Sequence, residues 1–283
     1  MAKISQKIPA KLNLTLDVKG KIGDFHEIES LVVSVNLFDK IILKKRKDNE
    51  ITVKEKGFKT ELKAEDNNAF KAVKLFMETY GTSGVDITVK KKIPLSAGLG
   101  GSAADIVAVL IGMKKLFHID ADLKKLAEKL GSDAVYMLNG GFAMMTERGI
   151  KSVNLKLGFP LYFILLTNEK GISSKECYDR FDFIGKSSES TTETAFSYIL
   201  LRDFIGFKNT AKNDLYIPAK DLLPEIEGDM EELKKEEADF VSMTGSGSSL
   251  FMMFKDRKKR NEVFKNLVKK GYGGRLIKAK SIE

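Results

Sequence analysis

Pro94-Leu-Ser-Ala-Gly-Leu-Gly-Gly-Ser-Ala-Ala104 is a glycine-rich segment between an alternating stretch, Asp86 to Lys91, and an apolar stretch, Ile106 to Phe117. The alternation predicts a strand before the segment, and the nearly continuous apolar run predicts a buried helix after it. Glycine lets the backbone approach a ligand without obstruction by Cβ. The first N–H groups of a helix lack intrahelical partners and attract phosphate. The segment therefore predicts a phosphate-binding loop, with a ligand-free, glycine-rich helix entry as the alternative.

Two common phosphate-loop patterns do not fit this segment. No Gly-Lys-Ser/Thr follows the glycines, and Ala103 occupies the place of the last glycine in Gly-x-Gly-x-x-Gly. Ser102 adds a hydroxyl that can bond a phosphate or a magnesium ion. The loop is thus neither a P-loop nor a dinucleotide-binding loop.

Length and composition narrow the class of protein. A chain of 283 residues suggests two domains, and 43% hydrophobic with 31% charged residues is typical of a globular protein with a sizeable core. A single cysteine, Cys177, excludes an intramolecular disulfide, and two histidines argue against a histidine-rich metal centre. The apolar runs are too short to span a membrane, and no secretory signal is seen, so we expect a cytoplasmic protein.

The net charge of +9 is concentrated at the C-terminal end of the chain. Residues 251–283 hold 11 Lys/Arg against 3 Asp/Glu, whereas residues 1–250 hold 37 against 36. Lys258 to Lys270 has helical spacing, with Val263 and Leu267 among the apolar residues of one face, so its lysines are interpreted as a solvated face. Nucleic-acid binding is the alternative, but no nucleic-acid motif is present.

Other segments predict an α+β protein. Strands are expected at Lys11–Val18, Leu31–Leu37 and Lys40–Arg46, and a helix at Asn67–Tyr80. His118 lies at the expected end of the buried helix and is interpreted as structural.

Five segments, which follow one another in the family's order, carry a family resemblance. Pro94 to Ala104 resembles the phosphate loop of the GHMP small-molecule kinases. Pro9-Ala-Lys-Leu-Asn-Leu14 and Gly23-Asp-Phe-His-Glu-Ile-Glu-Ser30 resemble the start of the 4-diphosphocytidyl-2-C-methylerythritol kinase family within that superfamily. Leu130-Gly-Ser-Asp133 is similar to its carboxylate segment, and Thr244-Gly-Ser-Gly247 to its second glycine loop.

The resemblance implies a fold and an activity. The fold would be α+β with two domains, a ribosomal-protein-S5-domain-2-like one over residues 1–155 and a ferredoxin-like one over 156–283, and the active site would lie in the cleft between them. The activity would be ATP- and Mg²⁺-dependent phosphorylation of the 2-hydroxyl of 4-diphosphocytidyl-2-C-methyl-D-erythritol in non-mevalonate isoprenoid synthesis. The partner would be a small molecule, not nucleic acid or a membrane.

The resemblance also implies the roles of individual residues. Asp133 would be the catalytic base and Lys11 its cationic partner; the alternatives are a helix-capping aspartate and an ordinary strand lysine. Asn67 and Lys91 would lie on the adenine side, although Asn67 could instead cap a helix and Lys91 be a solvated lysine. The triphosphate would be held by the loop residues Pro94, Ser96, Ala97, Gly98, Leu99, Gly100, Gly101, Ser102, Ala103 and Ala104, with Ser102 as a candidate magnesium ligand.

For the acceptor, the resemblance implies a cytosine ring stacked between Phe25 and Tyr178, with its edge bound by His26. The alternative makes both aromatic residues part of the core. Asn13 and the second loop (Thr244, Gly245, Ser246 and Gly247) would also contact the acceptor, unless that loop is a plain hairpin turn.

Departures from the family pattern keep other functions open. Ser102-Ala-Ala-Asp105 replaces the usual Gly-Ser-Ser-Asn, and Ala134-Val-Tyr136 replaces the usual Val-Pro-Phe. A GHMP kinase acting on mevalonate, homoserine or a sugar, and a non-catalytic nucleotide-binding paralogue, are therefore the alternatives.

Overall fold

The computed structural model describes residues 2–23, 25–58, 63–147, 149–185 and 189–283. The chain forms two compact units, neither of which is one continuous segment. Unit 1 comprises Met1–Ala10, Leu37–Leu95 and Gly100–Asn139, and unit 2 comprises Lys11–Asn36, Ser96–Leu99 and Gly140–Glu283. The strands β1 (Lys3–Asn13) and β3 (Phe25–Lys45) therefore contribute residues to both units.

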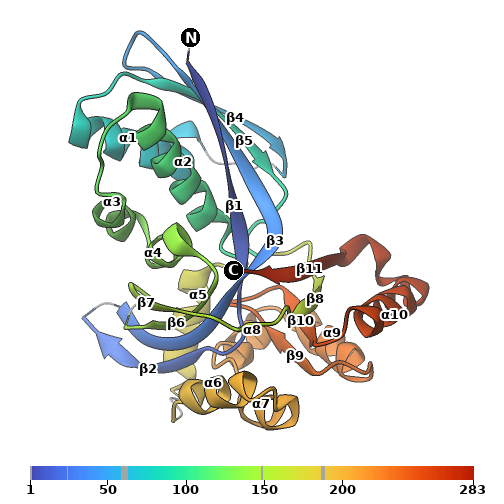
Figure 1. Cartoon of the computed structure of the whole chain (residues 1–283). Coiled ribbons are helices and arrows are strands. Elements are labelled where there is room, and N and C mark those ends of the chain that lie inside the picture. The colour runs from blue at the N-terminus through green and yellow to red at the C-terminus, as the bar shows by residue number, and fades with distance from the viewer. Residues whose placement is uncertain (1, 24, 59–62, 148, 186–188) are drawn as a thin grey trace. The chain divides into compact units, whose positions relative to one another are not determined.

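Unit 1 consists of a sheet with helices packed on it (Figure 1). Its strand β5 (Val85–Lys91) pairs in parallel with β4 (Ile51–Gly57) and antiparallel with the second half of β3. Val85, Ile87 and Val89 are buried on one face of β5, as the alternation predicts. The helical elements are η1 (Ala64–Asp66), α1 (Asn68–Tyr80), α2 (Gly101–Phe117), α3 (Leu123–Leu130) and α4 (Ser132–Asn139).

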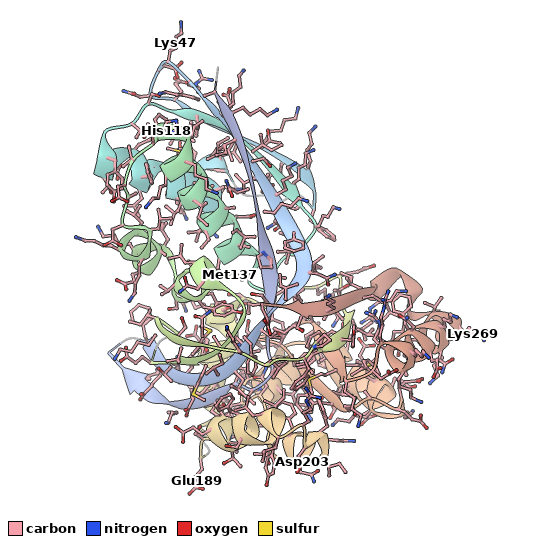
Figure 2. All side chains as sticks on the ribbon, viewed as in Figure 1. Lys47, His118, Met137, Glu189, Asp203 and Lys269 are labelled. Atoms are coloured by element: carbon pink, nitrogen blue, oxygen red, sulfur yellow. The ribbon has the colours of Figure 1, made fainter. Side chains whose placement is uncertain are left out.

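The helix α2 is the buried helix that the apolar run predicts. Most of its residues are buried, among them Ile106 to Leu110. Gly112 allows close packing on the sheet, because a Cβ at this position would lie 2.8 Å from Cδ1 of Leu43. His118 ends the helix as its C-cap in the left-handed conformation, which agrees with a structural role (Figure 2).

Unit 2 is built around four antiparallel strands in the spatial order β11-β8-β10-β9. They are β8 (Tyr162–Leu166), β9 (Phe240–Met243), β10 (Leu250–Phe254) and β11 (Leu276–Ile282). Helices separate β8 from β9 and β10 from β11, which is the strand–helix–strand–strand–helix–strand pattern of ferredoxin-like folds. The helices are α5 (Ser174–Ile184), α6 (Thr192–Leu200), α7 (Phe204–Thr210), α8 (Tyr216–Leu222), α9 (Glu225–Lys234) and α10 (Arg257–Leu267), followed by η2 (Val268–Tyr272) and η3 (Gly273–Arg275).

The rest of unit 2 is a set of strands joined to the first half of β3. That half pairs antiparallel with β2 (Asp17–Ile22) and with β6 (Phe142–Thr146), which in turn pairs with β7 (Lys151–Leu155). The end of β11 also pairs with β3, through Ser281 opposite Val35. The C-terminal strand thus connects the two strand groups of this unit.

Asp17 fixes the start of α6 within unit 2. Its carboxylate is fully buried and accepts hydrogen bonds from the backbone N–H groups of Thr191, at 2.9 Å, and Thr192, at 2.8 Å. Burial alone would raise the pKa of Asp17, but these hydrogen bonds and the charge of Lys212 keep it below its ordinary value. The ionised carboxylate therefore caps the helix from a strand distant in sequence.

Three of the predicted strands have wrong bounds. The stretch Lys11–Val18 is not one strand: β1 ends at Asn13, and the N–H of Leu16 donates to the carbonyl of Lys212 instead of continuing a ladder. The separate strands expected at Leu31–Leu37 and Lys40–Arg46 are parts of the single strand β3.

The basic C-terminal helix has the predicted two-faced character. In α10, Val263 and Leu267 are buried, whereas Lys258 and Lys265 are exposed. Lys269, in η2 just after α10, projects outward (Figure 2). In the described part of the chain, no helix has both the length and the apolar character needed to cross a membrane. The cytoplasmic location stays a prediction.

Candidate active site

Two glycine-rich segments, Ser96–Leu99 and Thr244–Ser249, pack against each other in unit 2. Gly98 has φ +71°, and a Cβ at this position would lie 2.0 Å from the carbonyl oxygen of Thr244. The Thr244 hydroxyl donates to the carbonyl of Gly98 at 3.3 Å. A Cβ on Gly245 would in turn lie 2.9 Å from the Gly98 oxygen. Only glycine fits at these positions, because a Cβ on either residue would collide with the backbone of the other segment.

We expect Gly98→Ala to destabilise unit 2 more than Gly185→Ala does. Both glycines are left-handed, with φ +71° and +69°, so both substitutions carry similar backbone strain. Nothing lies within 4 Å of a Cβ on Gly185, whereas the Cβ on residue 98 collides with backbone. The difference in the free energy of unfolding, measured by urea titration, should be about 1–3 kcal/mol, as for overpacked sites. Equal losses would contradict the close packing of the two segments.

Lys11 and Asn13, at the end of β1, connect with both glycine segments. The backbone N–H of Lys11 donates to the carbonyl of Leu99 at 3.0 Å, and that of Asn13 donates to the Thr244 hydroxyl at 3.0 Å. The Lys11 ammonium donates to the Asn13 side-chain oxygen at 2.5 Å, and Lys11 is only 5% exposed. A buried cation is therefore held beside the glycine segments.

Sequence reasoning missed the residues that support the second glycine loop. The side-chain amide of Asn213 donates to the carbonyls of Met243 and Gly245, at 2.9 Å each. The hydroxyl of Ser174 lies 3.1 Å from that of Ser246, within hydrogen-bond distance. Neither residue belongs to a recognisable motif, and only their distant contacts reveal their role. The loop is thus a supported structure and more than a plain hairpin turn.

The predicted cytosine-binding residues lie around the start of β3 and around α5. The rings of His26 and Tyr178 stack, with centroids 4.5 Å apart and an angle of 21° between their planes. His26 Nε2 lies 2.7 Å from a carboxylate oxygen of Asp182. Phe25 is 53% exposed, so it is not a core residue. Asp24, which precedes Phe25 in the Gly23–Ser30 segment, lies outside the described residues.

Asp182 is the charged residue of this cluster that the sequence did not single out. The other oxygen of its carboxylate forms an ion pair with Lys21, at 2.6 Å. Partial burial works toward a higher pKa, but the hydrogen bonds from Lys21 and His26 keep the pKa of Asp182 below its ordinary value. The carboxylate therefore stays charged and orients the imidazole.

In unit 1, the start of α2 has the features of an anion site. Its N-cap, Gly100, is left-handed with φ +72° and has no side chain to cap the helix. A Cβ on Gly101 would lie 3.2 Å from Cγ2 of Ile93, so the backbone runs close to its neighbour. Ser102 is exposed in the first turn. The N–H groups of this turn and the Ser102 hydroxyl suit a phosphate.

The donor set near this helix fits magnesium only as a metal shared with phosphates. Among the described residues, no group of three or more His, Cys, Asp or Glu side chains is placed to hold a metal ion. Mg²⁺ is commonly held by one or two protein oxygens together with substrate phosphates. Ser102 is compatible with that mode.

Lys91 lies buried between two aspartates. Its ammonium is paired with Asp39 and, at 2.7 Å, with Asp105, and these side chains are only 3%, 2% and 10% exposed. Asp39 also accepts the backbone N–H groups of Lys92, at 2.6 Å, and Ile93, at 2.9 Å. The three residues link β3, the end of β5 and the first turns of α2. Lys91 is thus not a solvated lysine.

The carboxyl group of Asp105 has a strongly raised pKa. Burial raises the pKa of Asp105 to about 7; Lys91 opposes the shift, while Asp39 and Glu55 add to it. The ordinary value is 3.8. Between these values the folded protein keeps a proton that the unfolded chain has lost. The free energy of unfolding should therefore fall as the pH rises from about 4 to 7.

We expect Asp105→Asn to flatten this fall, because asparagine does not titrate. Urea unfolding at steps between pH 4 and 7 measures the slope for the wild type and the variant. Asp120→Asn is the control: Asp120 lies in the same unit, and its side chain is fully exposed. Lys114 keeps the pKa of Asp120 below 3.8, so the control should keep the wild-type slope. A wild-type slope in Asp105→Asn would contradict the assignment.

The other two predicted residues of unit 1 lie at helix starts. Asn67 is the N-cap of α1: its side-chain oxygen accepts the N–H of Ala69 at 2.9 Å, and its amide donates to Glu55 at 2.9 Å. The capping interpretation of Asn67 is confirmed. Asp133 is half-buried in the first turn of α4.

Comparisons with known proteins identify the family. The models described as the GHMP kinase N-terminal and C-terminal domains match residues 67–145 and 195–273. The chain belongs to the GHMP kinases. A 4-diphosphocytidyl-2-C-methyl-D-erythritol kinase of Macrococcus caseolyticus is 33% identical to this chain over 97% of its length and 99% of the relative. One of Bacillus pumilus is 31% identical over 94% of the chain and 93% of the relative.

Two solved structures of kinases resemble this chain. A crystal structure of 4-(cytidine 5'-diphospho)-2C-methyl-D-erythritol kinase matches with a TM-score of 0.81 and 25% identity, covering 99% of this chain and all of that one. A homoserine kinase from Cytophaga hutchinsonii matches with a TM-score of 0.75 at 19% identity, covering 100% of this chain and 95% of that one, which shows the shared fold alone. The resemblance to the 4-diphosphocytidyl-2-C-methylerythritol kinase family and the two-domain α+β fold class are confirmed. The protein is an ATP-dependent small-molecule kinase.

The domain boundary at residue 155 stays a prediction. It falls between the two matched segments, while the compact units of the structure group the chain in interleaved pieces.

Proposed function

We propose that the protein transfers the γ-phosphoryl group of ATP to the 2-hydroxyl of 4-diphosphocytidyl-2-C-methyl-D-erythritol, a step of non-mevalonate isoprenoid synthesis. The observation that carries this proposal is the similarity, over nearly the whole chain, to kinases named for that acceptor. Because donor and acceptor are both charged metabolites, we place the reaction in the cytoplasm.

Asp133 is the proposed base and Lys11 the proposed cation. Phosphoryl transfer to an alcohol needs a group that takes the hydroxyl proton and positive charge that stabilises the moving phosphoryl group. Asp133 lies half-buried in the first turn of α4. The buried ammonium of Lys11 is held by Asn13 beside the glycine segments of unit 2. Transfer is direct and in line, without a phosphoenzyme.

The N–H groups of the first turn of α2, from Gly101 onward, are proposed to bind the phosphates, and the Ser102 hydroxyl is the proposed protein ligand of magnesium. Mg²⁺, when bound, neutralises phosphate charge. Asn67 and Lys91 are proposed to define the adenine side. Since their polar atoms are bonded within unit 1, they act by fixing the starts of α1 and α2.

Phe25, His26 and Tyr178 are proposed to hold the cytosine ring of the acceptor. The support is the exposed ring of Phe25 and the imidazole of His26, oriented by Asp182. Flat rings are well held by aromatic faces together with one oriented polar group. The second glycine loop, Thr244 to Gly247, is proposed to bind the acceptor close to the transferred phosphate.

We expect Phe25→Ala to raise the KM for the acceptor while changing kcat little. Loss of one stacking face should cost about 1–3 kcal/mol, which is about five- to 150-fold in KM. Phe183→Ala is the matched control, since Phe183 is also an exposed phenylalanine of unit 2, 77% exposed on α5. Steady-state kinetics with varied acceptor measure both. An unchanged KM in Phe25→Ala would remove cytosine stacking from the proposal.

The acceptor itself is tested by ADP release. The protein is assayed with 4-diphosphocytidyl-2-C-methyl-D-erythritol, mevalonate, homoserine and galactose at equal concentration. We expect the first to give the highest kcat/KM by orders of magnitude. If another acceptor gave the highest kcat/KM, the proposed acceptor would be wrong although the protein would still be a kinase. ATP binding without turnover on any of these acceptors would favour a non-catalytic nucleotide-binding paralogue.

A further inference from the structure

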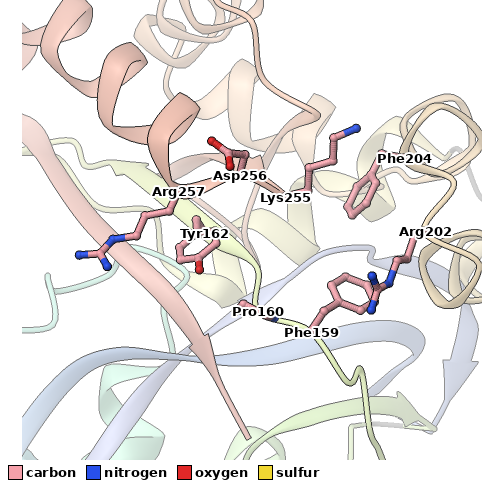
Figure 3. Close-up of a pocket in the computed structure, with 8 residues that line it drawn as sticks. All are labelled: Phe159, Pro160, Tyr162, Arg202, Phe204, Lys255, Asp256 and Arg257. Atoms are coloured by element: carbon pink, nitrogen blue, oxygen red, sulfur yellow. The ribbon is translucent and has the colours of Figure 1, made fainter.

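A hollow of about 510 Å³ opens on unit 2, away from every residue assigned above. Its wall combines three aromatic rings, of Phe159, Tyr162 and Phe204, with three cationic side chains, of Arg202, Lys255 and Arg257 (Figure 3). These residues come from the chain before and within β8, the α6–α7 region, and the connection from β10 to α10. The volume is within the range of small-molecule sites, about 300–1,000 Å³.

The charge of the wall is positive. The acidic residue of the lining, Asp256, is the N-cap of α10, and its carboxylate accepts the backbone N–H of Lys259 at 2.8 Å. Lys255 lies 3.8 Å from Asp239, but its side chain is 63% exposed, so this pair holds it only weakly. With three cations and one engaged carboxylate, the wall has an excess of positive charge.

The rings and cations are arranged in pairs. The Arg202 guanidinium lies 4.5 Å from the centroid of the Phe159 ring, across its face (Figure 3). The Lys255 ammonium lies 5.5 Å from the centroid of the Phe204 ring, and the two phenylalanine rings are 6.3 Å apart at 72°. Each pair presents an apolar surface next to a positive charge.

The hollow is separate from the glycine segments of unit 2. The strand β10 follows the second glycine loop at Leu250 and ends at Phe254, just before Lys255. Four residue steps of an antiparallel strand span about 14 Å. A ligand in the hollow would therefore lie at the opposite end of β10 from Thr244–Ser249.

We propose that this hollow binds a small anion that carries a flat aromatic ring. The ring packs against Phe159, Phe204 and Tyr162, and the phosphate or carboxylate pairs with Arg202 and Lys255. Recognition requires both parts, because a bare anion gains nothing from packing on the rings and a neutral ring forms no ion pair with the cations.

Three probes separate the contribution of ring packing from that of ion pairing. Their binding to the full chain is measured by isothermal titration calorimetry. 1-Naphthyl phosphate has ring and charge, 1-naphthol has the ring alone, and inorganic phosphate has the charge alone. We expect 1-naphthyl phosphate to bind at least about tenfold more tightly than either of the others, which corresponds to about 1.4 kcal/mol. Equal affinity for the phosphate alone, or for the naphthol alone, would overturn the proposal.

Substitutions in the lining test whether 1-naphthyl phosphate binds in the hollow. Arg202→Gln and Lys255→Gln should each weaken 1-naphthyl phosphate about three- to tenfold, and Phe159→Leu should weaken it while leaving phosphate affinity unchanged. Lys208→Gln removes one charge from exposed α7 surface outside the lining and should have no effect. If the affinity survives Arg202→Gln and Lys255→Gln, or falls equally in Lys208→Gln, the hollow is not the site. Using two separate charge variants keeps the test valid if one of them folds poorly.

Discussion

Asp133→Asn is expected to lower kcat about 10²–10⁴-fold, the range typical for loss of a general base. Asparagine keeps the size and hydrogen-bonding capacity of the side chain in the first turn of α4, but it cannot take the acceptor's proton. The affinity for ADP should change little, because the proposed phosphate site is the start of α2. Turnover is measured by ADP release, and nucleotide affinity by calorimetry.

Asp122→Asn is the control that separates catalysis from helix capping. Asp122 caps α3 in the same unit, with its carboxylate accepting the N–H of Lys125 at 3.1 Å. Asparagine is also a good cap, so both stability and turnover should stay near the wild type. A folded Asp133→Asn protein with near-normal turnover would refute the role of Asp133 as the base.

Lys91→Met should cause the largest loss of stability, about 3–5 kcal/mol, because removing one partner of a buried ion pair leaves unpaired charge behind. Here the charge left behind belongs to the buried Asp39, since its neighbour Asp105 already keeps a proton up to about pH 7. Urea titration measures the loss. Lys90→Met, at the exposed neighbouring position on β5, should change stability by no more than about 0.5 kcal/mol. Equal losses of stability in Lys91→Met and Lys90→Met would contradict the stabilising role of the buried ion pairs of Lys91.

Features that depend on neighbours in sequence were predictable. The helix α2 follows from its apolar run, and α1 from its spacing and from Asn67, whose short amide side chain is a preferred N-cap. The alternating faces of β5 follow in the same way. In each case the residues that decide the structure lie within a few positions of one another.

The prediction that β3 would break near Asp39 shows what sequence alone misses. A charged residue between apolar runs favours a turn, yet the strand continues through it. The carboxylate is stabilised by Lys91 and by the N–H groups of Lys92 and Ile93, more than 50 positions away. Local patterns hold no information about such a partner.

In the candidate site, too, local sequence motifs were predictable, whereas contacts between distant residues were not. The glycines of both loops were visible as motifs, but the contact between Gly98 and Thr244, 146 positions apart, and the support from Asn213 were not. Their positions result from the pairing of distant segments. The catalytic and binding roles rest on family resemblance and stay proposals until the variants are measured.

The interleaved units have a consequence for synthesis on the ribosome. Unit 1 has all of its residues once Asn139 has been added, whereas unit 2 contains Lys11–Asn36 and also the last residue, Glu283. At about 5–20 residues per second, the early segment waits roughly 12–50 s for its final strand partners. During that interval Val35, which is fully buried in the folded protein, lacks its strand partner Ser281. The early segment of unit 2 must therefore stay unpaired with β11, without aggregating, until the C-terminal strand has been synthesised.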